Sequence, residues 1–343
     1  MANIVVCSDG TWNRPEEDLE KDHPSNVLKL ARGISPETNG VAQHVFYDWG
    51  LGAYHSKLSA GTTGRGIHKN ILDGYRYIVQ NYCPGDKIFL FGFSRGAYTV
   101  RALSGLINNC GILQRDNAEL IAKAWQIYKS PRKSNAPSGD AAVSFRNRCS
   151  HPSRRVEFVG VWDTVGALGI PFSVLGLLDA HDEFYDTKMG SNVGIARHAL
   201  AIDEQRRDFE PTLWTPNEGV DLKQVWFAGV HADIGGSYGP DKTSGCEVAD
   251  TALAWMMREA ELAGLGLEPH LWAGLSDGLK APVHRSRRHI FRAKRAKPRN
   301  LLAKHCQIHN SVKRRYLEDE RYRPTELRLL VEKYGWDALS LCS

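Results

Sequence analysis

A short strand that runs straight into a helix through a Gly-x-Ser-x-Gly motif is the strongest constraint in this sequence. The apolar run Ile88–Phe91 predicts a buried strand, and a helix is predicted to begin at Arg95. Ser94 lies in the sharp turn between them, where Gly92 and Gly96 leave room for a close approach of strand and helix. The pattern indicates a nucleophile elbow at the C-terminal edge of a sheet, with an ordinary tight turn as the alternative.

Short apolar segments alternate with helical segments over most of the chain. The predicted strands are Asn3–Ser8, His44–Asp48, Lys87–Phe91, Val156–Trp162 and Lys223–Val230. The predicted helices are Asn26–Gly33, Gly66–Tyr82, Arg95–Asn109, Ala118–Tyr128 and Cys246–Gly264. Several strands are apolar on both faces, as is typical of a parallel sheet covered on both sides. The sequence therefore predicts an α/β-hydrolase-like fold, with a mostly parallel sheet and helices on both faces.

We find no internal repeat and no linker between two cores, so one α/β domain over residues 1–343 is expected. Ser130–Asp140 is rich in Ser, Pro and Gly, which predicts a loop-rich insertion near residues 130–150. Gly166–Leu178 is apolar and could line an acyl pocket, form a lid or be an ordinary core helix. A basic C-terminal extension is expected near residues 280–343.

Two further strand ends supply the partners that a nucleophilic serine needs. The strand Val156–Trp162 leads directly into Asp163. The strand Lys223–Val230 leads into His231. A base must take the proton of Ser94 and an acid must orient that base, and the order serine, acid, histidine is that of α/β hydrolases. Capping by Asp163 and a structural role for His231 are the alternatives.

The neighbouring loops supply candidate supporting groups. Asp233 is expected to fix the loop after His231 by accepting backbone N–H groups, and it is the second candidate for the acid. An oxyanion hole needs N–H donors beside the nucleophile. Arg95 is one expected donor, and Gly10 or Thr11 is the other.

Asp9, at the end of the first predicted strand, has two interpretations. It is either structural, or it combines with Asp163 and His231 in a metal site of the phosphatase kind. Such a ligand set would be thin and unclustered. We therefore expect no metal and no cofactor.

Charge and cysteine content exclude several classes of protein. The net charge is +5, but Lys280–Arg299 holds nine Lys and Arg and no acid, and the remaining chain has 35 bases against 39 acids. Nucleic acid is therefore not an expected partner, whereas the basic stretch is either a contact for an anionic membrane or a solvated loop. Seven cysteines, no two closer than 27 positions, indicate reduced thiols of a cytoplasmic protein. Neither a signal peptide nor an apolar run of ~20 residues is present.

Four motifs in order give the chain a family resemblance. They are Ser8–Asn13, Gly92–Tyr98, Gly160–Gly166 and Gly229–Gly236. Together they resemble the family called domain of unknown function 2235, whose best-known branch is the type VI secretion phospholipase effectors of the first lipase-effector class. Further matching positions are His198–Glu204, Arg206, Phe209, Pro211, Trp214, His309, Ser311, Arg315, Tyr322 and Pro324. The resemblance covers about residues 3–330.

The resemblance implies an α/β hydrolase that cleaves ester bonds with a triad of Ser94, Asp163 and His231. A phospholipid or other ester would be the substrate. Members of that branch can leave the cytoplasm through type VI secretion, which implies a secretion or immunity partner. The alternatives are a non-enzymatic binding module on a hydrolase scaffold and a metal-dependent phosphoesterase.

Overall fold

The apolar runs assemble into one sheet in the computed structural model, which describes residues 1–11, 13–50, 64–165, 189–287, 295–301 and 306–343. Across these residues the strand order is β2-β3-β1-β4-β5-β6-β7-β8-β9. Every neighbouring pair is parallel except β2 with β3. The predicted α/β class with a mostly parallel sheet is confirmed.

All five predicted strands are present, and the prediction missed one central strand. The strands are β1 (Ala2–Ser8), β2 (Glu37–Thr38), β3 (Val41–Asp48), β4 (Lys87–Phe93), β5 (Val156–Trp162), β6 (Val193–Ala201), β7 (Asp221–Phe227), β8 (Cys306–His309) and β9 (Leu341–Cys342). β6 has no continuous apolar run, because it contains Gly194, Arg197 and His198. Its buried arginine is paired with Glu259 at 2.5 Å, a long-range contact that the local sequence does not reveal.

The five predicted helices are present, with small changes in their ends. The α-helices are α1 (Asn26–Gly33), α2 (Gly64–Asn81), α3 (Arg95–Cys110), α4 (Ile121–Tyr128), α5 (Asp140–Cys149), α6 (His231–Gly235), α7 (Ala249–Leu262), α8 (Pro269–Ala273), α9 (Asn310–Glu318) and α10 (Thr325–Tyr334). The predicted helices correspond to α1, α2, α3, α4 and α7, whereas α5, α6, α8, α9 and α10 were not predicted. Short 3₁₀ turns include η1 (Arg115–Leu120), η2 (Lys133–Asn135), η5 (Arg207–Phe209), η6 (Gly278–Lys280) and η8 (Trp336–Ala338).

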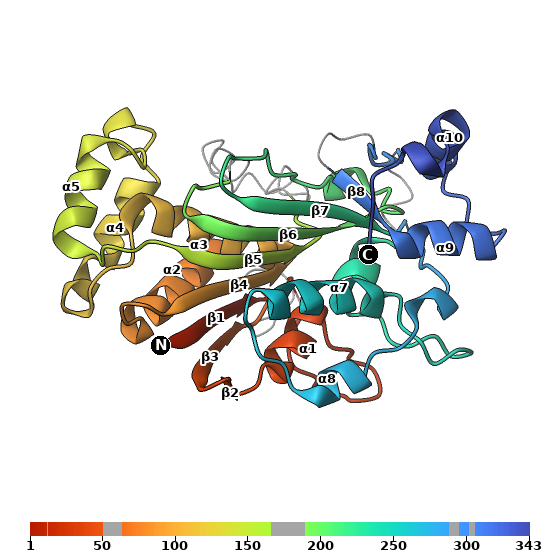
Figure 1. Ribbon diagram of the computed structural model, residues 1–343, viewed down its shortest axis with the longest axis horizontal. Helices are drawn as coiled ribbons and strands as arrows, with labels where there is room; N and C mark the ends of the chain where they lie inside the picture. The colour runs from red at the N-terminus through yellow and green to blue at the C-terminus, as the bar shows by residue number, and fades with distance from the viewer. Residues whose placement is uncertain (12, 51–63, 166–188, 288–294, 302–305) are drawn as a thin grey trace.

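Helices cover both faces of the sheet, as predicted (Figure 1). One core lies between the sheet and α2, α3, α4 and α5, and a second lies between the sheet and α1, α7 and α8. In β1, Ile4 and Val6 belong to the first core, whereas Val5 and Cys7 belong to the second. Because successive side chains of a strand point to opposite faces, burial on both sides explains the unbroken apolar runs.

The C-terminal residues extend the same sheet. β8 pairs parallel with β7, and β9 pairs with β8. A third apolar cluster joins the C-terminal helices to this edge and includes Trp226, Ile308, Val312, Leu327 and Leu330. The end of the predicted basic extension is therefore part of the fold, because β8 and β9 join the sheet and the C-terminal helices pack against it.

The predicted loop-rich insertion near residues 130–150 is only half correct. Residues 130–139 form turns around η2, but Asp140–Cys149 is the helix α5. Ala142 and Phe145 are buried on one face of α5, and this packing stabilises a helix that the sequence marks weakly. The apolar segment Gly166–Leu178 lies outside the described residues.

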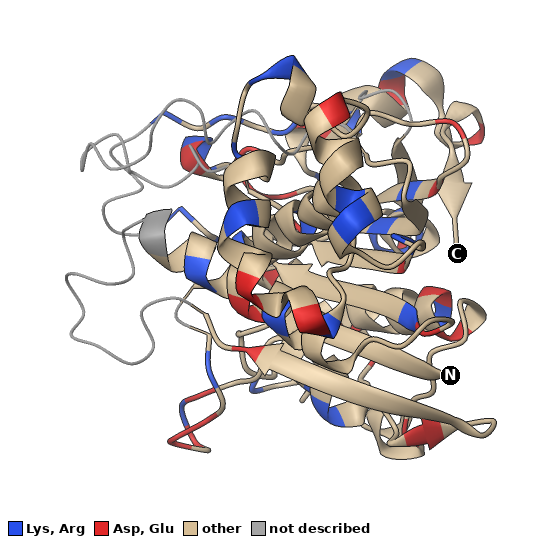
Figure 2. Cartoon of the chain, turned by 90° about the vertical axis from the view of Figure 1, so that its left-hand side faces the viewer, with Lys and Arg blue, Asp and Glu red and all other residues tan. Residues whose placement is uncertain are grey.

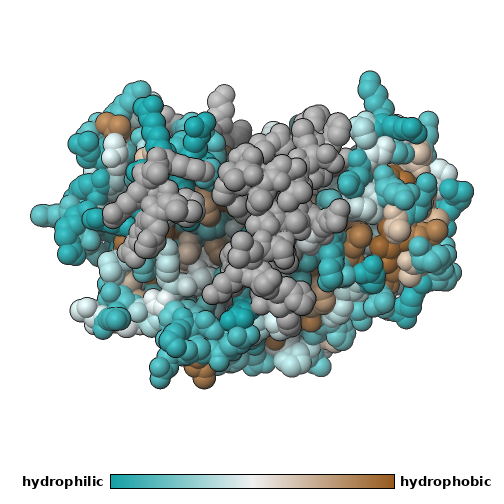
Figure 3. All heavy atoms as spheres, turned by 180° about the vertical axis from the view of Figure 1, so that it is seen from behind, coloured by the Kyte–Doolittle hydropathy of each residue, from teal (hydrophilic) through white to brown (hydrophobic). Residues whose placement is uncertain are grey.

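The surface of the described chain is polar and mixed in charge. Acidic and basic side chains are interspersed in the view of Figure 2, and small hydrophobic areas lie among hydrophilic ones on the face shown in Figure 3. Within the described residues, no helix is long and apolar enough to cross a membrane. All seven cysteines lie in described segments and are free thiols.

Candidate active site

Ser94 occupies a strained turn between β4 and α3. Its backbone has φ 56° and ψ −119°, a region that residues other than glycine rarely adopt. A Cβ on Gly92 would lie 2.4 Å from the carbonyl oxygen of Gly96. A Cβ on Gly96 would lie 2.0 Å from the carbonyl oxygen of Ser8. Both glycines of the motif are therefore required by close backbone approach, as the elbow interpretation predicts.

Asp163 lies beside this turn because β5 is the neighbour of β4. The Ser94 N–H donates to the carbonyl of Trp162, the residue before Asp163, at 3.1 Å. The Thr164 N–H donates to Nε2 of His198 on β6 at 3.1 Å, which fixes the chain just after the carboxylate. Asp163 itself is fully buried.

His231 meets Asp163, although not from a strand end as predicted. β7 stops at Phe227, and after Gly229, at φ 132°, the chain begins the short helix α6 at His231. Nδ1 of His231 lies 2.6 Å from Oδ2 of Asp163. The imidazole packs between Phe93, the residue before Ser94, and Phe209, with ring centroids 4.6 and 4.9 Å away.

Arg299 is the site residue that the sequence did not single out. Nη1 donates to Oδ1 of Asp163 at 2.5 Å and Nη2 to Oδ2 at 2.9 Å, and Nη2 also donates to the Phe209 carbonyl at 2.6 Å. The guanidinium is buried. In the sequence Arg299 is one of nine bases in a basic stretch, and no local signal distinguishes it from the others.

The charge of Asp163 is set by its partners. Burial alone would raise the pKa of this carboxyl, but the positive charge of Arg299 and the hydrogen bond from His231 hold the pKa well below its ordinary value. The group is therefore ionised at neutral pH.

The loop after β1 lies against the elbow, and Asp9 organises it. Four donors surround the Asp9 carboxylate, namely the Gly10 N–H at 2.7 Å, Asn13 Nδ2 at 2.9 Å, Ser25 Oγ at 2.5 Å and Tyr47 OH at 2.7 Å. Burial nevertheless raises the pKa of Asp9 above its ordinary value. This set of donors indicates a structural role for the carboxylate.

The three predicted oxyanion donors differ in their surroundings. The N–H of Gly10 already donates to Asp9, which argues against its role as an oxyanion donor. Thr11 follows in the same loop, and its buried Oγ1 has no hydrogen-bond partner among the described residues. Arg95 begins α3, so its N–H belongs to the first helical turn, where N–H groups have no intrahelical acceptor.

Asp233 is paired with a different histidine. Its Oδ1 lies 2.6 Å from Nδ1 of His284, and its Oδ2 accepts the N–H groups of Val230 and His284 at 3.0 and 3.1 Å. The expected loop-fixing contacts are present. The carboxylate in contact with Nδ1 of His231 is that of Asp163 instead.

The three residues considered for a metal site, Asp9, Asp163 and His231, make other contacts in the structure. Asp163 is occupied by Arg299 and His231, while Asp9 is surrounded by hydrogen-bond donors. In the part of the chain that the structure describes, no three His, Cys, Asp or Glu side chains are grouped to hold a metal ion.

A parallel sheet with a strand–turn–helix elbow and a buried Asp–His pair at its carboxyl edge defines an α/β-hydrolase-like protein. The chain belongs to the family of Tle1-like phospholipase effectors of type VI secretion systems, whose catalytic-domain model matches residues 2–259. The motifs around His309 and Tyr322 lie beyond the matched region.

Three individual proteins are similar to the chain. The uncharacterized protein YEL023C of Saccharomyces cerevisiae is 27% identical over 237 residues, which are 62% of this chain and 33% of that protein. The chain thus spans about a third of that relative. An uncharacterized protein from Pseudomonas aeruginosa aligns with a TM-score of 0.45 and 18% identity, over 80% of this chain and 48% of the other. The Tle1 effector, solved bound to the VgrG spike, aligns with a TM-score of 0.44 and 20% identity, over 72% and 53%.

Proposed function

We propose that this protein is a serine ester hydrolase that cleaves lipid esters, with phospholipids as the preferred substrate class. The single observation that carries the proposal is the 2.6 Å contact between His231 and Asp163, made beside the strained turn of Ser94. Membership in a phospholipase effector family supports the substrate class.

In the proposed mechanism His231 takes the proton of Ser94 as the hydroxyl attacks the ester carbonyl. Asp163 holds the imidazole through Nδ1 and stabilises the imidazolium that forms. N–H groups of Arg95 and Thr11 hold the oxyanion. The alcohol leaves with a proton from His231, and water activated by the same histidine then releases the acid from the acyl-enzyme.

Labelling with a fluorophosphonate tests the nucleophile. We expect wild type to be labelled at Ser94, and mass spectrometry to detect free fatty acid and lysolipid from a mixed phospholipid panel. Ser94→Ala should lose both, whereas Ser104→Ala, at a buried serine within the following helix α3, should keep both. If Ser94→Ala keeps more than about a tenth of the wild-type kcat, the assignment is wrong.

Chelation separates this mechanism from a metal-dependent phosphoesterase. Hydrolysis by a triad needs no metal, so we expect full activity after exhaustive treatment with EDTA. Loss of activity that one divalent ion restores would favour the metal alternative. Export by type VI secretion and an immunity partner stay predictions from the family resemblance, and cytoplasmic synthesis stays a prediction from the cysteine content.

A further inference from the structure

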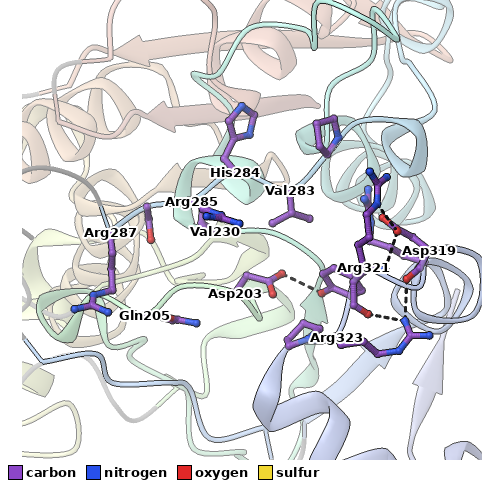
Figure 4. A pocket seen from close by; sticks show the side chains of 15 residues that line it. Asp203, Gln205, Val230, Val283, His284, Arg285, Arg287, Asp319, Arg321 and Arg323 are labelled. Atoms are coloured by element: carbon purple, nitrogen blue, oxygen red, sulfur yellow. Dashed lines mark hydrogen bonds and ion pairs between the residues drawn. The ribbon is translucent and has the colours of Figure 1, made fainter. Parts of the chain in front are cut away.

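A pocket of about 550 Å³ lies behind the loop that carries His231, and arginines line much of it (Figure 4). Val230, the residue before His231, and Asp203 are among the residues that line it. The basic side chains that line it are His284, Arg285, Arg287, Arg315, Arg321 and Arg323. They come from two parts of the chain, the basic stretch and the region of α9 and α10, so the tertiary structure creates the cluster.

Among the described residues that line the pocket, the carboxyl groups are fewer than the guanidinium groups. Oδ1 of Asp319 accepts a hydrogen bond from Nε of Arg321 at 3.1 Å. Asp203 accepts the N–H of Gly229 at 2.7 Å and the hydroxyl of Tyr322 at 3.0 Å, and burial raises its pKa to about 7. The pocket therefore has five guanidinium groups against two carboxyls, one of which is partly protonated at neutral pH.

Two of the guanidinium groups are held in place by backbone carbonyls. Arg315 is 5% exposed and donates to the carbonyls of Ala281 and Gly278 at 2.9 and 2.5 Å. Its Nε has no hydrogen-bond partner among the described residues. Arg323 donates through Nη1 to three carbonyl oxygens at 2.7 to 2.8 Å.

Carbonyl oxygens orient a guanidinium but do not neutralise its charge. Asp203 and Asp319 lie close enough to Arg315 to compensate part of its charge. An anion that enters the pocket would add a favourable charge interaction and accept hydrogen bonds. The planar fork of arginine matches the oxygen geometry of phosphate better than that of a monatomic ion. The volume exceeds what a single phosphate fills, so a larger phosphorylated molecule fits.

We propose that this pocket binds a phosphate group, carried by a soluble molecule or by a lipid headgroup, at a site separate from the Ser94 centre. The site adjoins the proposed active centre through one hydrogen-bond path. Ser286 lines the pocket and donates to Glu204 at 2.8 Å, and Glu204 accepts the backbone N–H of His231 at 3.3 Å. Binding itself does not depend on hydrolysis.

Isothermal titration with inorganic phosphate tests the site. The test variant is Arg285→Gln/Arg321→Gln, because both side chains are exposed and their loss should leave the fold intact. The control is Arg132→Gln/Arg148→Gln, which removes the same charge from exposed positions near η2 and in α5. We expect saturable binding by wild type, about tenfold or more weaker in the test variant and unchanged in the control. Absent saturable binding, or an equal loss in both variants, would overturn the proposal.

Vesicles distinguish the two sources of phosphate. All proteins carry Ser94→Ala, so that the proposed hydrolysis does not consume the lipid, and recovery of intact lipid is checked by mass spectrometry. The vesicles consist of phosphatidylcholine with added phosphatidic acid. If the protein sediments with them and this binding depends on Arg285 and Arg321, the ligand is assigned as a lipid headgroup. If inorganic phosphate binds but sedimentation with vesicles does not depend on Arg285 and Arg321, the ligand is assigned as a soluble molecule.

Discussion

Asp163 receives hydrogen bonds from three partners, which are His231, Arg299 and the backbone N–H of Ala201 at 3.0 Å. The carboxylate is fully buried, so its charge is stabilised only by these contacts. Arg299 donates a hydrogen bond to each carboxylate oxygen of Asp163, and Oδ2 also contacts the imidazole of His231. The residue that orients the proposed base is therefore itself oriented by an arginine from 136 positions further along the chain.

Replacing the two candidate acids should separate their roles. We expect Asp163→Asn to lower kcat by about ten-thousandfold, because an amide cannot stabilise the imidazolium and favours the wrong tautomer. Asp233→Asn should lower kcat by less than about tenfold, since Asp233 contacts His284 rather than His231. Steady-state kinetics on a short soluble ester measure both, and the reverse ranking would move the acid to Asp233.

A stability control is needed because Asp163→Asn leaves the Arg299 charge buried without its carboxylate. The double variant Asp163→Asn/Arg299→Gln removes both charges and should fold better than the single variant. Its kcat should still be as low as that of Asp163→Asn. Recovered activity in the double variant would show that the loss came from misfolding.

Arg299→Gln should destabilise the protein in a pH-dependent way. Asp163 has a lower pKa in the folded protein than in the unfolded chain, so its ionisation stabilises the fold above about pH 4 and this contribution is lost as the pH falls. We expect the unfolding free energy of Arg299→Gln to be about 3–5 kcal/mol below that of wild type at neutral pH. The difference between the two proteins should become smaller below about pH 4, as measured by urea unfolding.

Lys297→Gln is the matched control for that experiment. Lys297 lies two residues before Arg299 and pairs with Glu210 at 2.5 Å, with both side chains about half exposed. An exposed pair contributes little, so the change in unfolding free energy should stay below about 1 kcal/mol. Equal losses in the two variants, or a loss for Arg299→Gln that does not vary with pH, would contradict the role given to the buried pair.

At the scale of elements, the turn between β4 and α3 depends on backbone contact rather than on side chains. Gly96 in α3 lies against the end of β1, where a Cβ would overlap the Ser8 carbonyl oxygen at 2.0 Å. The first turn of α3 is thereby held against the loop of Gly10 and Thr11, which brings the candidate oxyanion donors together.

Gly96→Ala should therefore displace α3 and damage both stability and activity. We expect a loss of more than about 3 kcal/mol in unfolding free energy, because a backbone oxygen cannot yield as a side chain can. Gly274→Ala is the control, since its nearest backbone oxygen is 3.3 Å away, and it should change stability by less than about 1 kcal/mol. Thermal unfolding of a Gly96→Ala variant that matches wild type would show that the close approach is relaxed in solution.

Among the described residues, local pattern predicted five of the nine strands and five of the ten α-helices, and it failed where long-range contacts decide. α1 was predicted to the residue, because its apolar positions follow helical spacing and Ser25 caps its N-terminus by accepting the Leu28 N–H. β6 was missed because the partners of its Arg197 lie 24 and 62 positions away on Asp221 and Glu259.

At the scale of the whole molecule, the sheet and the candidate site both require the C-terminal residues. The family model matches residues 2–259, yet Arg299 binds Asp163 and β8 covers the edge of β7. Trp226 of β7 is buried in an apolar cluster that includes side chains of α9 and α10.

A chain that ends at residue 279 should consequently fail to fold as a soluble protein. It loses the partner of Asp163 and exposes the edge and apolar face of β7, which favours aggregation. Soluble yield, size-exclusion chromatography and fluorophosphonate labelling of Ser94 measure the outcome. A soluble, labelled fragment would show that the matched region is sufficient by itself.

The sequence by itself predicted the α/β architecture, the elbow at Ser94 and His231 with Asp163 as its first candidate partner, while Asp233 stayed open as the second. The elbow and Asp163 follow from local patterns, since a residue that ends a parallel strand lies at the same sheet edge as the others. His231 lies near that edge but begins α6, four residues after β7 ends. Only the tertiary structure decided that Asp233 pairs with His284, that Arg299 holds Asp163, and that five arginines from two distant segments face one pocket. The physical reason is that charged side chains pair at a buried site only when the fold brings their segments into contact. The spacing of residues along the chain does not show which segments come into contact.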